Sequence, residues 1–149
     1  VVEETMTKDE ADIRKILDDR AKALYAKNSD RLLASSAADS FSFDLAPPLQ
    51  HKGSKADAKA GLEDWFATWK GPISWENRDV TVFADGSIAF STALSRISGT
   101  KTDGADVSLW FRSTNGYRKE NGAWKLVHLH SSVPFAMDGS FRACVDLQP

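Results

Sequence analysis

The sequence predicts an α+β fold, in which N-terminal helices pack on one face of a mainly antiparallel sheet. Apolar residues recur at helical spacing in the first half of the chain, whereas the second half consists of long runs typical of strands. Asp85-Gly86 and Asn121-Gly122 separate these runs and are strong hairpin signals. A long sheet is expected to curl over its helices, which leaves a small-molecule cavity between them.

Three helices are expected to begin behind capping residues, at Thr7, Asp30 and Ser54. Glu10 and Asp57 stand at capping-box spacing behind the first and third of these residues. The first helix is expected to run through Tyr25. The third helix is expected to carry an aromatic stripe, formed by Leu62, Trp65, Phe66 and Trp69.

Five strands are expected to follow the helical patterns or lie between them. Residues 41–45 alternate like a strand, and Pro47-Pro48 stops it. Four longer strands are expected over residues 74–83, 87–98, 107–120 and 124–133. We expect one domain over residues 1–149, with residues 135–149 as a C-terminal tail.

The composition limits which classes of partner and which cellular compartment are expected. The chain has 149 residues, with 19 basic and 21 acidic side chains, so nucleic acid and anionic membranes are not expected as partners. The single cysteine, Cys144, cannot form an internal disulfide, which favours the cytoplasm. The chain begins at Val1 without a methionine, so export stays open. Three histidines and one cysteine predict no metal site, and no cofactor is expected.

Three segments resemble one superfamily. Residues 43–53, followed by a helix, are similar to the segment that carries the catalytic aspartate of ketosteroid isomerases. Residues 122–131 resemble the closing strand of SnoaL-like proteins and of the calcium/calmodulin-dependent kinase association domain. Residues 132–149 resemble the tail of bacterial SnoaL-like proteins. The resemblance to the nuclear transport factor 2-like superfamily implies a cone-shaped roll, with about three helices on a strongly curved mixed sheet.

Asp44 is the candidate catalytic residue. The resemblance to ketosteroid isomerases implies that it acts as a base on a carbon acid. Strand alternation places it opposite Phe43 and Leu45, and burial in a cavity would raise the pKa of its carboxyl group. The alternative is an aspartate that caps the turn before Pro47.

The final strand carries His128, His130 and Ser131. The resemblance to the kinase association domain implies that Ser131 faces the cavity and that both histidines face away, toward a dimer interface. The preceding hairpin leaves two alternatives open. A two-residue turn places Arg112 and Thr114 on the Ser131 face. A three-residue turn with a bulge places Asn115 and Tyr117 there and Arg112 beside the histidines.

Three further residues are candidate ligand contacts. Arg96 corresponds to a pocket arginine of the association domain and could pair with Asp44, or it could extend from the sheet into water. Trp65 and Trp69 could form an aromatic roof over the cavity, although such residues are mostly part of a core.

Three functions fit these residues. The first is a small-molecule binder or cofactor-free isomerase, cyclase or lyase of the SnoaL-like group, with acid–base chemistry on a carbonyl- or carboxylate-containing ligand. The second is a non-catalytic oligomerisation or ligand-sensing module, like the kinase association domain. The third is a metal-free iota-type carbonic anhydrase. A homodimer through the outer face of the sheet is expected for the chain.

Overall fold

The computed structural model describes residues 5–149. Helix α1 (Lys8–Tyr25) is followed by α2 (Ser29–Leu33) and α3 (Lys55–Phe66). As predicted, Thr7 caps α1 by accepting a hydrogen bond from the amide of Glu10, and Ser54 and Asp57 form a capping box at α3. Within residues 5–149, no helix is long and apolar enough to cross a membrane.

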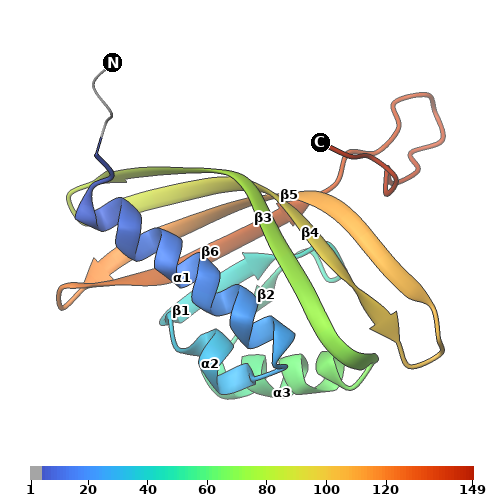
Figure 1. Ribbon diagram of the computed structural model, residues 1–149, viewed down its shortest axis with the longest axis horizontal. Helices are drawn as coiled ribbons and strands as arrows, with labels where there is room; N and C mark the ends of the chain where they lie inside the picture. The colour runs from blue at the N-terminus through green and yellow to red at the C-terminus, as the bar shows by residue number, and fades with distance from the viewer. Residues whose placement is uncertain (1–4) are drawn as a thin grey trace.

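Six strands form one open mixed sheet. Their bounds are β1 (Ser36–Phe43), β2 (His51–Lys52), β3 (Trp69–Asp85), β4 (Ile88–Lys101), β5 (Asp106–Glu120) and β6 (Ala123–Ser132). Their order in the sheet is β2-β1-β6-β5-β4-β3, and only β1 and β6 pair in parallel. The long strands arch around α1, with α2 and α3 near one end of the molecule (Figure 1). The predicted α+β class is confirmed.

One face of the sheet packs against α1 and holds the core; we call it the inner face. Near the start of α1, Ile13 packs with Tyr117 and Leu126. Near its end, Ala23 and Leu24 pack with residues of α2, α3 and the sheet, among them Leu32, Phe66, Ile73 and Phe111. The opposite surface of the sheet is the outer face.

Two helix boundaries differ from the sequence prediction. Asn28, rather than Asp30, caps α2, because its side-chain oxygen accepts a hydrogen bond from the amide of Arg31 at 3.0 Å. Helix α3 ends at Phe66, so Trp69 does not extend the helical stripe. Instead Trp69 begins β3 and pairs with Lys101, whose Nζ lies 4.1 Å from the Trp69 ring centroid. Sheet pairing therefore overrides the helical spacing.

The β5–β6 hairpin resolves the two alternatives for the inner face. Glu120 pairs with Ala123, so the turn at Asn121 and Gly122 has two residues, both with positive φ. The ladder then shifts, because Gly116 pairs with His128 while Tyr117 pairs with Leu126. Val127 is the extra residue of this bulge. The bulge places Asn115 and Tyr117 on the Ser131 face, and Arg112 beside the histidines.

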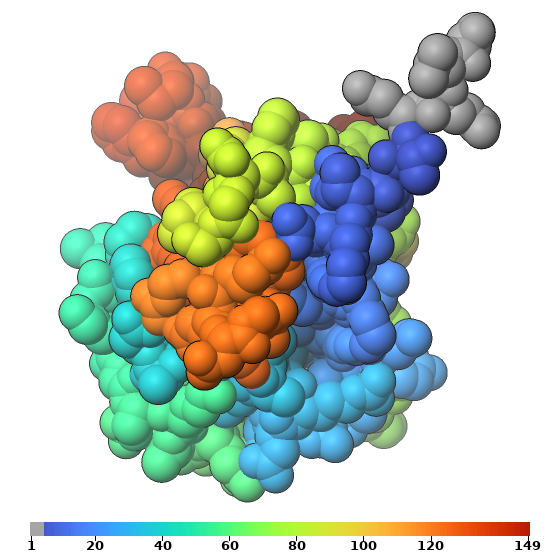
Figure 2. Space-filling model, turned by 90° about the vertical axis from the view of Figure 1, so that its left-hand side faces the viewer, coloured from blue at the N-terminus to red at the C-terminus, as the bar shows by residue number. Residues whose placement is uncertain are grey.

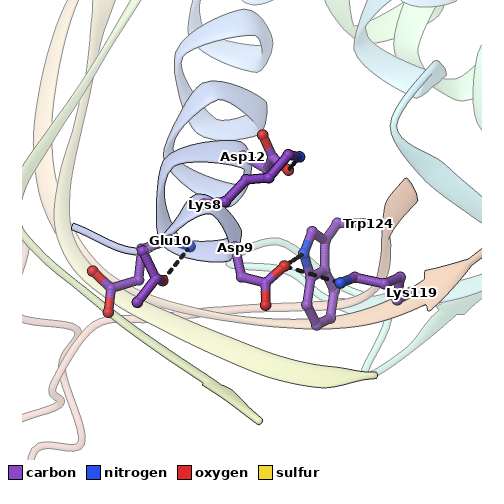
Figure 3. A network of polar contacts seen from close by, with 7 residues as sticks. Lys8, Asp9, Glu10, Asp12, Lys119 and Trp124 are labelled. Atoms are coloured by element: carbon purple, nitrogen blue, oxygen red, sulfur yellow. Dashed lines mark hydrogen bonds and ion pairs between the residues drawn. The ribbon is translucent and has the colours of Figure 1, made fainter. Parts of the chain in front are cut away.

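A polar contact ties the start of α1 to this hairpin. Oδ1 of Asp9 accepts hydrogen bonds from Lys119 Nζ at 3.0 Å and from Trp124 Nε1 at 2.9 Å (Figure 3). These two bonds hold the pKa of the Asp9 carboxyl group below its usual value, the one from Lys119 having the larger effect. The contact fixes α1 over the bulged strand and so fixes the inner face beneath it.

The C-terminal segment stands apart from the sheet (Figures 1 and 2). Phe135 bridges to Ala143, and the Cys144 amide donates to the Pro134 carbonyl oxygen at 2.7 Å, which closes a loop. Its side chains Phe135, Met137 and Phe141 are exposed.

Candidate functional site

A belt of buried polar side chains crosses the inner face between the two apolar clusters. Ser95 Oγ donates to Asn77 Oδ1 at 2.9 Å and lies 2.8 Å from Ser113 Oγ. Ser91 and the Tyr117 hydroxyl are 2.8 Å apart. Ser91, Ser95 and Asn115 are buried. A buried polar group without a hydrogen-bond partner costs free energy. The side chains of this belt avoid that cost because they bond to one another.

Tyr117 and Asn115 lie in this belt, on the face that the three-residue turn would have given them. The turn itself has two residues, and the bulge lies within β6 instead. Burial raises the pKa of Tyr117, while hydrogen bonds from Ser91 and Asn115 and the charge of Arg20 partly oppose the rise. The phenol is therefore neutral at physiological pH. Only 1% of Tyr117 is exposed, so its hydroxyl acts on its neighbours within the belt.

Ser131 also lies on the inner face, where it pairs with Ser113. Leu129, two residues earlier, pairs with Asn115 and packs in the core cluster around Tyr117. Ser131 is partly buried, near the end of β6. It therefore continues the polar belt toward β1, the next strand of the sheet.

Asp44 follows directly on the end of β1. Ser42 pairs with Leu129, and alternation places Asp44 on the same inner side. The Asp44 side chain is 48% exposed, and its Oδ2 lies 3.5 Å from His51 Nε2. Burial, the expected reason for a basic carboxylate here, is thus incomplete. The structure pairs Asp44 with an imidazole instead.

Arg20 of α1 lies opposite these residues. Its Nη1 donates to the Leu32 carbonyl oxygen at 2.9 Å, which holds the side chain beside α2. Burial lowers the pKa of Arg20 to about 10, although the charges of Tyr117 and Asp44 partly oppose this shift. Arg20 therefore connects the polar belt to Asp44 electrostatically.

Several predicted site residues lie on the outer face. Arg112, His128 and His130 pair there with neighbours of the same face, and His128 Nδ1 contacts the Phe41 carbonyl oxygen at 2.9 Å. The final strand thus divides its polar residues as the resemblance implied, with Ser131 on one side and both histidines on the other. Within the described chain, no site joins the histidines to Ser131.

Arg96 also lies on the outer face. Its Nε donates to Ser108 Oγ at 3.1 Å, and its Nη1 lies 3.9 Å from Glu76. The suggested pair between Arg96 and Asp44 is therefore not formed. The physical reason is register, because Arg96 pairs with Trp110 while its neighbours Ser95 and Ile97 face inward.

The two tryptophans proposed as a roof belong to the core at the α3 end of the molecule. Their rings meet edge to face with centroids 5.7 Å apart. Trp69 is 4% exposed, and Trp65 packs beside it at the edge of the same cluster. This arrangement matches the core reading of the stripe.

Two clefts of about 300 Å³ flank α1. The first lies between α1 and the α2–β1 segment and is lined by Lys15, Ile16, Asp19, Arg20, Arg31, Ala34 and Ser35. The second lies between α1 and β3, and Arg14 and Asp18 are its charged residues. In residues 5–149, no group of three or more His, Cys, Asp or Glu side chains is arranged to hold a metal ion.

Sequence reasoning missed Arg20 and His51. Arg20 stands three residues after Leu17 and four before Leu24, so helical spacing already placed it on the buried stripe. His51 had no local signal. It reaches Asp44 because the chain returns after Pro47-Pro48 and pairs His51 with Ser42.

The fold is the cone of the nuclear transport factor 2-like superfamily. The sequence profile of the SnoaL-like domain matches residues 13–136, and the chain belongs to this family. No curated protein matches the chain significantly.

Solved structures agree with this assignment. An NTF2-like protein of unknown function from Pseudomonas putida KT2440 is 30% identical, with a TM-score of 0.85 over 97% of this chain and 99% of that one. Two others share the fold at lower identity. A candidate scytalone dehydratase from Novosphingobium aromaticivorans is 18% identical, with a TM-score of 0.75 over 95% and 94% of the chains. A candidate calcium/calmodulin-dependent protein kinase II association domain from Xanthomonas campestris is 20% identical, with a TM-score of 0.69 over 85% and 86%.

Proposed function

We propose that this SnoaL-like protein binds a small carbonyl- or carboxylate-containing molecule and performs cofactor-free acid–base chemistry on it. The observation that carries the proposal is the Asp44–His51 pair on the inner side of the sheet edge, within the electrostatic reach of Arg20. Asp44 is the base, and His51 orients its carboxylate. An imidazole has one nitrogen that can accept a proton and one that can donate a proton, so the pair can pass a proton onward.

The test is proton exchange at the carbon beside a carbonyl group. Levulinate and cyclohexanone serve as probes in heavy water, where proton NMR follows the loss of the exchanging hydrogens. General acid–base catalysis contributes about 10²- to 10⁴-fold, so Asp44→Asn should slow the protein-dependent exchange at least about 100-fold. Asp64→Asn, an exposed aspartate on α3, is the matched control and should not slow it.

A probe that binds without any exchange above the buffer rate would contradict the catalytic part of the proposal. The chain would then be a ligand-binding module without catalysis, the second function considered from the sequence. The two histidines on the outer face give no support to a carbonic anhydrase site that combines them with Ser131.

We also infer that two copies pair through the outer face. An aromatic row crosses this face in register, from Phe83 to Phe90, past Gly116, to His128 and Phe41. The Phe83 and Phe90 rings stack with centroids 4.8 Å apart, yet the residues remain 55% and 45% exposed. An exposed apolar row of this kind is typical of a protein interface.

Sedimentation velocity tests the pairing. Phe90→Asp should convert a dimer into a monomer, because it places a charge within the row, beside the exposed Phe83 ring. Phe141→Asp changes an exposed phenylalanine of the C-terminal loop and should leave the dimer intact. A Phe90→Asp protein that sediments as the wild type does would exclude this face.

A further inference from the structure

Arg20 is a half-buried cation on α1. Within residues 5–149 it forms no ion pair, although it lines the first cleft beside α1. Its one protein hydrogen bond in that part of the chain goes to a backbone oxygen, that of Leu32. A guanidinium has five N–H donors, so most of them are free of the protein.

The neighbouring charges cannot neutralise Arg20. Asp19 lines the same cleft, but its Oδ2 lies 2.5 Å from Lys15 Nζ and its Oδ1 lies 4.0 Å from Arg31 Nη2. The cleft therefore contains three basic side chains against one carboxylate that already faces two of them. Asp44 acts on Arg20 only at longer range and is itself paired with His51.

A partly desolvated charge without a partner carries an energetic cost, and a ligand of opposite charge removes that cost. We propose that Arg20 binds the carboxylate group of the ligand, through the cleft between α1 and the α2–β1 segment. This inference rests on the proposed function and names the ligand class: a small organic monocarboxylate, whose reacting carbon lies toward Asp44.

The proposed function favours a carboxylate over a phosphate, because its ligand carries a carbonyl or carboxylate group. Lys15 and Arg31 both face Asp19, whereas Arg20 has no carboxylate facing it among residues 5–149. The planar fork of arginine also matches the two oxygens of a carboxylate. A volume of about 300 Å³ is at the lower limit for ligand sites and suits a small molecule.

The other flank of α1 provides a control. Arg14 belongs to the same helix and lines the second cleft, where Asp18 is the one acidic residue, so the charged residues of that lining sum to zero. Its Nη2 donates to the Val80 carbonyl oxygen at 2.9 Å, as Arg20 does to Leu32. The two arginines therefore differ in surroundings rather than in the kind of protein contact that they make.

Calorimetric titration with benzoate, benzamide and inorganic phosphate tests the proposal. Wild type should bind benzoate at least about tenfold more tightly than benzamide, which has the same shape without the charge. Arg20→Gln should remove this preference, Arg20→Lys should retain part of it, and Arg14→Gln should leave it unchanged. Should Arg20→Gln fail to fold, the Nε–H resonance of Arg20 in the wild type reports directly, and it should shift with benzoate and not with benzamide.

Equal binding of benzoate and benzamide would overturn the proposal. So would tighter binding of phosphate, or a loss of preference in Arg14→Gln instead of Arg20→Gln. Asp44→Asn should still bind benzoate. The inference about Arg20 therefore stands if Asp44→Asn leaves proton exchange unchanged, and the proposed chemistry stands if Arg20→Gln binds benzoate normally.

Discussion

Removing the Tyr117 hydroxyl tests whether the polar belt of the inner face is an energetically coupled unit. The hydroxyl lies 2.8 Å from Ser91 Oγ, and the two residues are 1% and 2% exposed. Tyr117→Phe therefore removes a hydrogen bond and leaves a buried serine without that partner. A buried group left unsatisfied costs about 1–3 kcal/mol, so we expect the free energy of unfolding to fall by about that amount.

The double-mutant cycle with Ser91→Ala makes the prediction sharp. Ser91→Ala alone should also destabilise the protein, because it leaves the phenol unpaired. The double variant should lose less than the sum of the two single variants, by about 0.5–1.5 kcal/mol, the usual net value of one hydrogen bond. Urea unfolding followed by tryptophan fluorescence measures all three values. Additive losses would show that the two hydroxyl groups do not interact and that the belt is not an energetically coupled unit.

Two further predictions concern the frame around the site. Asp9 has a lowered pKa in the folded protein, so its contribution to stability is present above its ordinary pKa and is lost as pH falls through the folded value. The wild type should therefore be more stable than Asp9→Asn at neutral pH, and thermal unfolding should show the difference shrinking below about pH 4; a constant difference would refute the assignment. A Cβ at Gly99 would lie 3.0 Å from ring carbons of Trp69 and 3.1 Å from the Pro72 carbonyl oxygen, so Gly99→Ala should destabilise by about 1–3 kcal/mol. Gly61→Ala in α3, where nothing lies within 4 Å, should instead stabilise by about 0.5–1 kcal/mol, and similar urea midpoints for the two variants would contradict the packing around Trp69.

The sequence was sufficient for features that depend on neighbours along the chain. The caps at Thr7 and Ser54 and the hairpin turn at Asn121-Gly122 are local, and each forms where it was predicted. The end of α3 was wrong because Trp69 is held by pairing with Lys101, a contact between distant segments that helical spacing does not encode.

The inner face could not be read from alternation alone. A bulge at Val127 shifts the ladder by one residue, and this shift determines that Asn115 rather than Arg112 lies beside Ser131. The partner of Asp44 was equally unpredictable from local sequence, because His51 reaches Asp44 only through the pairing of β2 with β1. Arg20 could have been predicted as a site residue, since helical spacing places this charged side chain on a buried stripe, where it needs a partner.

The exchange of carbon-bound protons in levulinate tests the central claim most directly, because this probe has both a carboxylate for Arg20 and a ketone for Asp44. The account predicts that the wild-type protein accelerates exchange, that Asp44→Asn loses at least about 100-fold of this acceleration, and that Asp64→Asn loses none. Equal rates for the wild type and Asp44→Asn, with levulinate bound to both, would contradict it.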